Sequence, residues 1–388
     1  MKKHILTVIG ARPQIIKAAA VSRAIHSAAD SHGVPFSGQI EEKILHTGQH
    51  YDDNMSGAFF AELGIPEPDY NLHVGSGTHG AQTAKMIDGI EEVLLGEHFD
   101  GLLLYGDTNS TLAGAVAAAK LHVPVYHVEA GLRSFNMAMP EEQNRIVCDH
   151  LSTLLFAPTQ TAVDNLRREG LCDSAARFRN GSARKVVMAG DVMYDNSTYF
   201  SQLAEQHSRI LSELHLTDRQ FVLATIHRDN NTDEPQRLTA IVNAVLAISA
   251  EYNMPVVLPL HPRTRKMLDV NTPPDLLHRL LGADNIHIIP PASFFDIIEL
   301  ERHAAVVMTD SGGVQKEAFF FNTPTVILRP QTEWVEIVQA GAGILADAEM
   351  ARILSAFEKL NGKKVTFPHL FGDAHAAEHI LEQIILNS

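Results

Sequence analysis

Residues 305–321 read AVVMTDSGGVQKEAFFF, and this stretch guides the interpretation of the whole chain. The apolar run 305–308 predicts a buried β-strand, the glycine pair predicts a turn, and the apolar spacing over 314–321 predicts a helix. A strand, a glycine turn and a helix in this order aim backbone N–H groups and the positive helix end at one spot. That spot suits a phosphate group.

Within this stretch, Gly312 and Gly313 let the backbone approach a ligand closely, and Ser311 adds a hydroxyl donor. Glu317 lies about one turn inside the helix, where it is able to accept hydrogen bonds from the hydroxyls of a ribose. An ordinary capped turn between strand and helix uses the same residue types for local reasons. The stretch alone therefore leaves a nucleotide site and an ordinary turn equally open.

The size and composition indicate a globular protein of two domains. A chain of 388 residues exceeds one ordinary core, and 45% apolar with 20% charged residues is typical of soluble proteins. No apolar run reaches transmembrane length, and the short N-terminal run broken by Thr7 predicts a first strand rather than a signal peptide. Two cysteines, Cys148 and Cys172, make no disulfide framework and fit a reducing cytoplasm.

The formal net charge of −15 argues against a nucleic-acid partner, which would require a basic face. It leaves room for a local basic pocket that binds an anionic small molecule. The 21 histidines show no convincing zinc spacing, so we expect no metal. We also expect no other cofactor and no membrane partner.

Strand patterns alternate with helix patterns nearly throughout, which predicts an α/β protein with a parallel sheet in each half. We expect an N-terminal domain at 1–180 and a C-terminal domain at 190–366. The polar and basic segment 170–190 is interpreted as the linker between them. The last helical stretch, 374–388, is expected to pack back across the first domain.

Charged side chains follow several expected strands at their carboxyl ends, where open α/β sheets bind ligands. Asp107, Glu129 and Glu141 follow strands of the first half, while Arg12 and Lys17 lie at the start of the first helix. Carboxylates held together and partly desolvated have raised pKa values, as acid/base catalysis requires. Structural ion pairs, or a helix N-cap in the case of Asp107, are the alternative interpretation.

Further candidates lie near these positions. Arg133 and Arg145 are close in sequence to the acidic set and are expected to bind substrate. His227 follows the strand expected at 221–226, at the corresponding edge of the second half. Cys148 is expected to be a small packing residue rather than a nucleophile.

The chain resembles the non-hydrolysing UDP-N-acetylglucosamine 2-epimerase family. The motifs occur in family order and together cover nearly the whole chain, although each alone is modest. They are 10–13 (GARP) with Lys17, 106–108 (GDT), 127–133 (HVEAGLR), 140–142 (PEE) with Asn144 and Arg145, 227–228 (HR), and 309–313 (TDSGG) with Gln315 and Glu317.

The resemblance implies a GT-B-like fold, in which the parallel sheets of two Rossmann-like domains face a central cleft. It implies reversible conversion of UDP-GlcNAc to UDP-ManNAc, in which UDP is eliminated to leave a 2-acetamidoglucal and is then added back. It also implies a homodimer. The implied roles are diphosphate binding by Arg12, Lys17, His227, Ser311, Gly312 and Gly313, ribose binding by Glu317, and C2 proton transfer by Asp107, Glu129 and Glu141, with His227 counted among the catalytic residues.

Two segments depart from the pattern of many family members. The segment 134–139 is shorter, and Trp334-Val335 stands where many members have Arg-Pro. Both variants resemble a branch that epimerises UDP-2,3-diacetamido-2,3-dideoxy-glucuronic acid at C2, which we take as the second substrate candidate after UDP-GlcNAc. A glycosyltransferase of the same shape, a hydrolysing epimerase that releases free ManNAc, and a UDP-sugar sensor without turnover are the less favoured alternatives.

Overall fold

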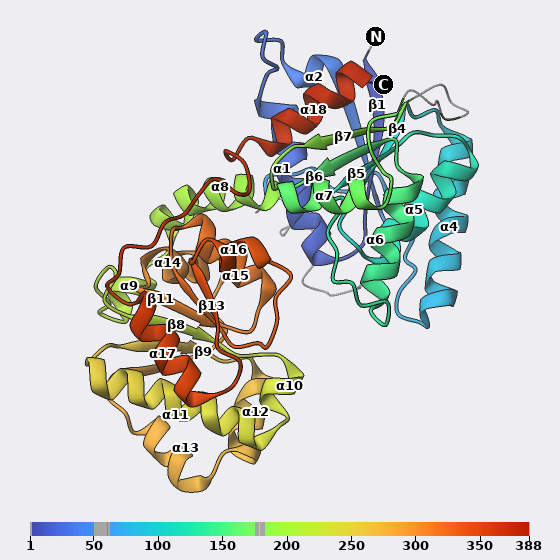
Figure 1. Ribbon diagram of the computed structural model, residues 1–388. Coiled ribbons are helices and arrows are strands. Elements are labelled where there is room, and N and C mark those ends of the chain that lie inside the picture. Colours follow the sequence, from blue (N-terminus) through green and yellow to red (C-terminus); the bar gives the residue numbers. More distant parts are fainter. Residues whose placement is uncertain (1, 50–59, 61–62, 175–177, 179–182, 388) are drawn as a thin grey trace. The chain divides into compact units, whose positions relative to one another are not determined.

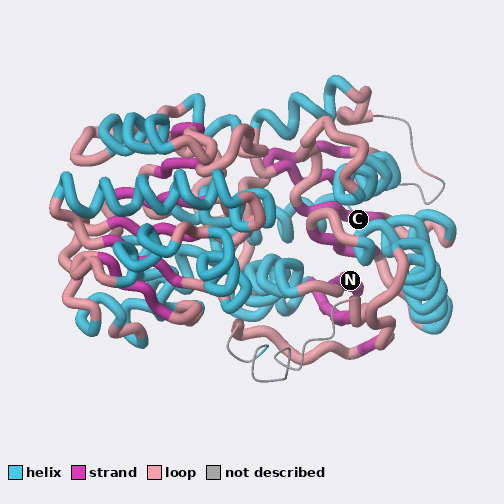
Figure 2. The backbone as a smooth tube through the Cα atoms, turned by 90° about the horizontal axis from the view of Figure 1, so that it is seen from below, coloured by secondary structure: helices cyan, strands magenta, loops and turns pink. Residues whose placement is uncertain are grey.

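The computed structural model describes residues 2–49, 60, 63–174, 178 and 183–387 (Figure 1). The chain forms two compact units: Met1–Asn196 with His369–Ser388 make the first, and Ser197–Pro368 make the second. In each unit the strands lie between helices (Figure 2). The expectation of two Rossmann-like halves with parallel sheets is confirmed.

The first unit contains a seven-stranded parallel sheet with the order β3-β2-β1-β4-β5-β6-β7. The central strand β4 is buried along its whole length, as expected for a parallel strand covered on both faces. Tyr105 pairs with Val128, so β4 and β5 end side by side. The strands are β1 (Lys3–Ile9), β2 (Ile40–His46), β3 (Tyr70–Asn71), β4 (Gly101–Tyr105), β5 (Val125–Val128), β6 (Leu154–Ala157) and β7 (Lys185–Met188).

Helix α5 lies directly on this sheet because its inner face consists of small residues. A Cβ added at Gly114 would lie only 2.6 Å from Cδ2 of Leu104. The turn that carries Asp107 connects the end of β4 to the start of α5 and therefore lies at the carboxyl edge of the strands. The helices are α1 (Arg12–Ser27), α2 (Phe36–Gln39), α4 (His79–Gly96), α5 (Asn109–Lys120), α6 (Pro140–Leu151), α7 (Gln160–Arg168), α8 (Val192–His207) and α18 (Ala376–Asn387).

The second unit contains a six-stranded parallel sheet with the order β10-β9-β8-β11-β12-β13. Thr225 pairs with Thr309, so β8 and β11 end together. The strands are β8 (Val222–Thr225), β9 (Val256–Pro259), β10 (Ile286–Ile289), β11 (Val306–Thr309), β12 (Thr325–Ile327) and β13 (Gly343–Leu345). The helices are α9 (Ile210–Glu213), α10 (Asp229–Thr232), α11 (Pro235–Tyr252), α12 (Pro262–Asn271), α13 (Pro274–Leu281), α14 (Phe294–His303), α15 (Gly312–Phe320), α16 (Val335–Gln339) and α17 (Met350–Leu360).

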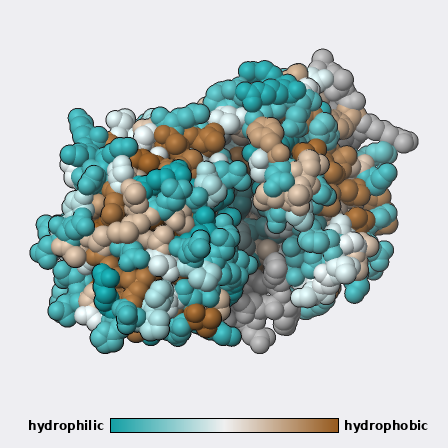
Figure 3. All heavy atoms as spheres, turned by 60° about the horizontal axis from the view of Figure 1, so that its bottom comes forward, coloured by the Kyte–Doolittle hydropathy of each residue, from teal (hydrophilic) through white to brown (hydrophobic). Residues whose placement is uncertain are grey.

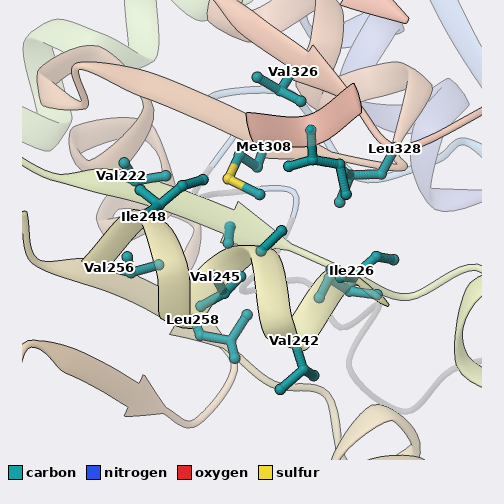
Figure 4. Close-up of a cluster of buried hydrophobic side chains, with 14 of the residues drawn as sticks. Val222, Ile226, Val242, Val245, Ile248, Val256, Leu258, Met308, Val326 and Leu328 are labelled. Carbon is teal, nitrogen blue, oxygen red and sulfur yellow. The ribbon is translucent and has the colours of Figure 1, made fainter. Parts of the chain in front are cut away.

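The main core of the second unit lies between its sheet and α11 (Figure 4). Val222, Met308 and Val326 contribute one side chain each from three neighbouring strands, and Val245 and Ile248 meet them from the helix. All of them are essentially inaccessible to water. Burial of this apolar surface holds β8 and β11 rigidly, and the polar turns that follow both strands are fixed with them.

The segment 170–190, interpreted from sequence as a linker, contributes strand β7 to the first sheet, where Lys185 pairs with Leu154. The division between the units falls between Asn196 and Ser197, within α8, and therefore later than residue 180. Strand β7 was not expected because it is short and its residues are only half-buried or exposed. An edge strand of this kind carries little of the apolar pattern that reveals a central strand.

Helix α18 lies against α1 in the first unit (Figure 1). Asp195 accepts hydrogen bonds from the N–H groups of Ala376 and Ala377, at 3.1 and 2.8 Å, and so caps the start of this helix. Near the middle of the helix, Glu382 accepts a hydrogen bond of 2.7 Å from the N–H of Ser31. The last helix is thus bonded to segments from the beginning and the end of the first unit's continuous portion.

Among the described residues, no helix is long and apolar enough to cross a membrane. On the face drawn in Figure 3, hydrophobic groups are separated by hydrophilic side chains. Cys148 is buried and Cys172 is exposed, and both are free thiols. Cys148 packs in the core of the first unit.

Candidate active site

Two carboxylates lie just beyond the paired ends of β4 and β5 in the first unit. Glu129 has a left-handed backbone conformation with φ of 70°, which turns its side chain toward α1, where it forms an ion pair with Lys17. Gly106 lies against this pair: a Cβ there would be 3.1 Å from Nζ of Lys17 and 3.4 Å from Oε2 of Glu129. With φ of 65°, Gly106 meets both the conformational and the steric requirement for glycine.

Asp107 forms the second pair, with Arg145 of α6. Its Oδ2 lies 2.8 Å from Nη2 and 3.0 Å from Nε of the guanidinium group, a geometry that fixes the carboxylate. Nη1 of Arg145 also donates to Glu142 at 2.6 Å. Asn144, on the same helix, donates to the backbone carbonyl of Asp107 at 2.9 Å.

Glu141 and Glu142 are adjacent in sequence but lie in opposite environments. Glu141, the residue expected to transfer a proton, is exposed in the first turn of α6. Glu142 is 1% exposed and accepts hydrogen bonds from the N–H groups of Ser134 and Phe135, at 2.9 and 2.8 Å. Burial alone would raise the pKa of Glu142, but these N–H donors and Arg145 hold it below its ordinary value.

Beneath these turns, a fully buried histidine joins the ends of β4 and β5. Nδ1 of His127 lies 2.7 Å from Asp149, and Nε2 lies 2.8 Å from the carbonyl oxygen of Gly106. Because both ring nitrogens face acceptors, both must donate, so the ring is protonated. Burial acts against the charge, but Cys148 and Asp149 outweigh it and raise the pKa of His127 well above its ordinary value.

Arg133 belongs to the same buried network and not to a ligand surface. Its guanidinium lies 2.7 Å from Asp149 and 2.7 Å from Glu169, and its side chain is 1% exposed. The sequence pattern placed it with the substrate-binding residues, but its donors already face two carboxylates. We therefore leave it out of the proposed ligand contacts.

In the second unit, the turn after β11 and the start of α15 have the geometry of an anion site. Ser311 is the N-cap of the helix, and its hydroxyl accepts a hydrogen bond from the N–H of Val314 at 3.4 Å. Gly313, in the first turn, is exposed. A Cβ at Gly312 would lie 2.1 Å from Oε1 of Glu333, so glycine leaves room for that side chain. N–H groups at such a helix start favour phosphate.

His227 approaches this turn from the end of β8. Asp310 is fully buried and accepts hydrogen bonds from the backbone N–H groups of His227 and Arg228 and from the side chain of Asn231. Nδ1 of His227 lies 3.0 Å from Asp310, while the side chain as a whole is 52% exposed. Burial would raise the pKa of Asp310, but His227, Asn231 and the N–H donors hold it below its ordinary value. With Nδ1 held by Asp310, Nε2 is left for a ligand.

The loop after β12 also contacts the start of α15. Nε1 of Trp334 donates to the carbonyl oxygen of Gly312 at 3.0 Å, and Nζ of Lys316 lies over the indole ring, 4.5 Å from its centroid. Arg329 pairs with Glu333 at 2.9 Å. Trp334, which stands where many family members have arginine, thus fixes the turn at Gly312. Lys316, which was not among the residues expected from the sequence, forms a cation–π contact with its ring.

The remaining expected residues lie at the edges of these two groups. Arg12 is the first residue of α1 and is exposed, and Glu317 is half-buried in α15. The structure therefore brings Lys17, Asp107 and Glu129 together with Arg145 in the first unit. Ser311, Gly312, Gly313 and His227 come together in the second. Among the described residues, no cluster of three or more histidine, cysteine or acidic side chains is arranged to hold a metal ion.

In the first unit, carboxylates are able to transfer protons, and the cations beside them stabilise negative charge. In the second unit, the start of a helix with a histidine beside it is able to bind a phosphate. Two parallel α/β units, one with groups for proton transfer and the other with a phosphate site, are the features of a GT-B-like protein that acts on a nucleotide-linked substrate.

Comparison with known proteins narrows this class. The family model for UDP-N-acetylglucosamine 2-epimerase matches residues 36–385. The chain is 47% identical to UDP-2,3-diacetamido-2,3-dideoxy-D-glucuronate 2-epimerase of Pseudomonas aeruginosa, over 98% of this chain and 99% of that protein. It is 39% identical to UDP-N-acetylglucosamine 2-epimerase of Methanocaldococcus jannaschii, over 96% of each. The crystal structure of UDP-GlcNAc 2-epimerase from Methanocaldococcus jannaschii in complex with UDP-GlcNAc and UDP has a TM-score of 0.77 at 38% identity, covering 98% of both chains.

The chain belongs to the UDP-N-acetylglucosamine 2-epimerase family. The enzyme class expected from the sequence, an isomerase of the non-hydrolysing kind, is confirmed, as is the GT-B-like fold.

Proposed function

We propose that the protein inverts C2 of a UDP-linked 2-acetamido sugar by eliminating UDP, adding it back to C1 and returning a proton to the opposite face of C2. The observation that carries this proposal is the set of carboxylates at the ends of β4 and β5, each held by its own cation. Asp107 is paired with Arg145, and Glu129 is paired with Lys17. Removing a weakly acidic C2 proton requires a positioned base, and returning it from the opposite side requires an acid.

In the proposed reaction, a carboxylate takes the proton from C2 while the bond between C1 and the diphosphate oxygen breaks. The electron pair of the C2–H bond forms the C1=C2 double bond of the 2-acetamidoglucal, and UDP leaves with the other pair. Re-addition of UDP to C1 and delivery of a proton to the opposite face of C2 give the epimer. Asp107, Glu129 and Glu141 share these proton transfers.

The second unit supplies the site for UDP in this proposal. The N–H groups at Gly312 and Gly313, the hydroxyl of Ser311 and Nε2 of His227 stabilise the charge that develops on the leaving diphosphate. Glu317 accepts hydrogen bonds from the ribose. From the first unit, Arg12 also binds the diphosphate, and Lys17 acts on it as well as on Glu129, with which it is bonded in this structure. No metal or other cofactor enters this scheme.

The proposed substrate is UDP-2,3-diacetamido-2,3-dideoxy-glucuronic acid, because the 47% identity to the Pseudomonas aeruginosa enzyme exceeds the 39% identity to the Methanocaldococcus jannaschii enzyme. The Trp334-Val335 departure from the common motif agrees with this choice. Conversion of UDP-GlcNAc to UDP-ManNAc, which the motifs alone placed first, is the second candidate. The chemistry at C2 is the same for both.

The test is to incubate the purified protein with each UDP-sugar in D₂O and to follow the proton spectrum. Loss of the C2 proton signal together with a new anomeric signal supports epimerisation, and the faster of the two sugars identifies the substrate. An Asp107→Asn variant should exchange C2 at least about 10²-fold more slowly. Release of free sugar and UDP would show a hydrolysing enzyme. Binding of both sugars without any exchange would sink the proposal and leave a sensor or a transferase.

The resemblance also leads us to propose a homodimer, and the two cysteines without a disulfide framework lead us to propose that it works in the cytoplasm. Light scattering during size-exclusion chromatography measures the mass directly, and a single-chain mass of 42.6 kDa at micromolar concentration would contradict the dimer.

A further inference from the structure

The loop between β5 and α6 contains a side chain whose exposure and backbone conformation both require an explanation. Phe135 is 74% exposed, more than any other large hydrophobic side chain of the described residues. Its φ of 57° lies in the left-handed region, which a bulky side chain rarely adopts. Met137 and Met139, on the same short loop, are also exposed, at 58% and 36%.

One buried side chain enforces this conformation. Glu142 accepts hydrogen bonds from the N–H groups of both Ser134 and Phe135, at 2.9 and 2.8 Å, and so holds the backbone that leads into the strained residue. The accepting residue is well shielded from water, because Glu142 is 1% exposed. Backbone strain persists only where its surroundings over-determine it, and such strain concentrates at functional sites.

The same carboxylate is connected to the candidate acid/base group. Nη1 of Arg145 donates to Glu142 at 2.6 Å, while Nη2 of the same guanidinium lies 2.8 Å from Asp107. A chain of contacts therefore leads from Asp107 through Arg145 and Glu142 to the backbone of Phe135. The loop also lies in the sequence between Glu129 and Glu141, so candidate carboxylates stand at both of its ends.

We propose that Phe135 contacts the sugar of the UDP-sugar substrate and contributes to its selection. This inference rests on the proposed function and deepens it. An aromatic ring covers the C–H face of a pyranose and the methyl groups of acetamido substituents, which are apolar surfaces of the substrate that the charged groups cannot bind. Glu142 is a positioning residue in this arrangement, because it holds both the ring's backbone and the cation that binds Asp107.

A glycine substitution tests the proposal, because glycine tolerates the left-handed backbone while it removes the ring. We expect Phe135→Gly to unfold at the same temperature as the wild-type protein or a higher one. We expect its KM for the UDP-sugar to rise about tenfold or more, since the apolar contact is lost. Its affinity for UDP alone, which lacks the sugar, should stay unchanged. Phe135→Leu, which keeps an apolar side chain, should recover part of the lost affinity.

The matched control is His122→Gly. His122 is also exposed and has φ of 61°, but it lies after α5, at the opposite end of the sheet. We expect this variant to gain stability without any change in KM. The comparison separates relief of backbone strain from loss of a substrate contact.

Three outcomes would overturn the inference. One is an unchanged KM in Phe135→Gly, and another is an equal loss of affinity for UDP and for UDP-sugar. A third is a drop in oligomeric mass that accounts for the lost activity, which would make Phe135 a contact between subunits. If the wild-type protein turned over neither sugar, the proposed function would fail, but calorimetric binding of UDP-sugar against UDP would still decide the role of Phe135.

Discussion

Each unit pairs a histidine with a buried aspartate, and the two pairs differ in whether a ring nitrogen of the histidine is left without a partner in the pair. In the first unit, His127 and Asp149 are both fully buried, and both ring nitrogens of the histidine have partners. In the second unit, Asp310 is fully buried, but the side chain of His227 is 52% exposed and only Nδ1 faces the aspartate.

The difference shows how the same residue pair serves two purposes. His127 is an internal cation that joins the turns after β4 and β5, and its charge is balanced by Asp149. His227 keeps a ring nitrogen for solvent or ligand, while Asp310 fixes its orientation, as carboxylates often do for functional histidines. We therefore expect changes at the first pair to affect folding and changes at the second to affect turnover.

The largest expected effect is at Asp149. Asp149→Asn removes one charge from a buried network and leaves His127 and Arg133 without full compensation. The free energy of unfolding of the first unit should fall by about 3–5 kcal/mol, measured by denaturant titration or by hydrogen exchange of β5. Asp164→Asn, which removes a partly exposed ion pair with Arg167, is the control and should change stability by about 0.5 kcal/mol or less. Equal losses of stability in the two variants would contradict the structural role assigned to the His127–Asp149 pair.

The second prediction concerns His227. His227→Asn should lower kcat/KM by about 10²-fold, because a donor to the leaving diphosphate is lost. The stability of the second unit should change by no more than about 0.5 kcal/mol, since the side chain is half exposed. His127→Asn should show the reverse pattern, with a large loss of stability. A His227 variant that is unstable but fully active when folded would contradict this assignment.

A third buried acid, Glu301 in α14, sharpens the comparison because it lacks the partners that Asp149 and Asp310 have. The side chain is fully buried, and neither carboxylate oxygen has a hydrogen-bond partner among the described residues. Burial, with a smaller contribution from Glu317, raises the pKa of Glu301 well above its ordinary value. The folded state therefore binds this proton more tightly than the unfolded state, so stability falls as pH rises above about 4.3, the unfolded pKa.

Glu301→Gln should accordingly increase the free energy of unfolding by roughly 1–3 kcal/mol at pH 8 and by less at pH 5. Thermal unfolding at both pH values measures the difference. Glu299→Gln on the same helix is the control, because Glu299 is paired with Arg302 at 2.6 Å and should not gain stability when neutralised. A stabilisation that is independent of pH would show that ionisation of Glu301 is not the cause.

The smallest expected effect is at Trp334. Trp334→Phe keeps a ring beside Lys316 but loses the hydrogen bond to the carbonyl oxygen of Gly312, so affinity for UDP should fall about three- to tenfold. Trp334→Leu, which also removes the ring face, should weaken binding further. Isothermal calorimetry with UDP measures both. If UDP bound to the two variants as tightly as to the wild-type protein, the loop would not hold the anion site.

The residues whose placement after a strand was predicted correctly are those with local signatures. Ser311, Gly312 and Gly313 follow closely after an apolar run, and Asp107 and Glu129 also stand close after expected strands. Such patterns depend only on neighbouring residues and on the rule that ligands gather at the carboxyl ends of parallel strands.

The features that were missed depend on contacts between distant segments or on helix orientation. Glu141 and Glu142 are the same residue type, and only the rotation of about 100° per residue around α6 decides which one is buried. Arg133 meets Asp149 and Glu169, which lie 16 and 36 residues further along the chain. No spacing rule connects such positions, so their pairing emerges only when the sheet is assembled.

The docking of α18 on α1 has a consequence for synthesis of the chain. A ribosome delivers residues in order, so the whole second unit emerges before the helix that completes the first. Until then, Asp195 has no helix start to cap, and the surface of α1 that α18 covers stays open to water. The first unit therefore stays incomplete while the second unit is synthesised and folds. Domains usually fold in order from the N-terminus during synthesis. Here the docking of α18 completes the N-terminal unit only after the second unit has been synthesised.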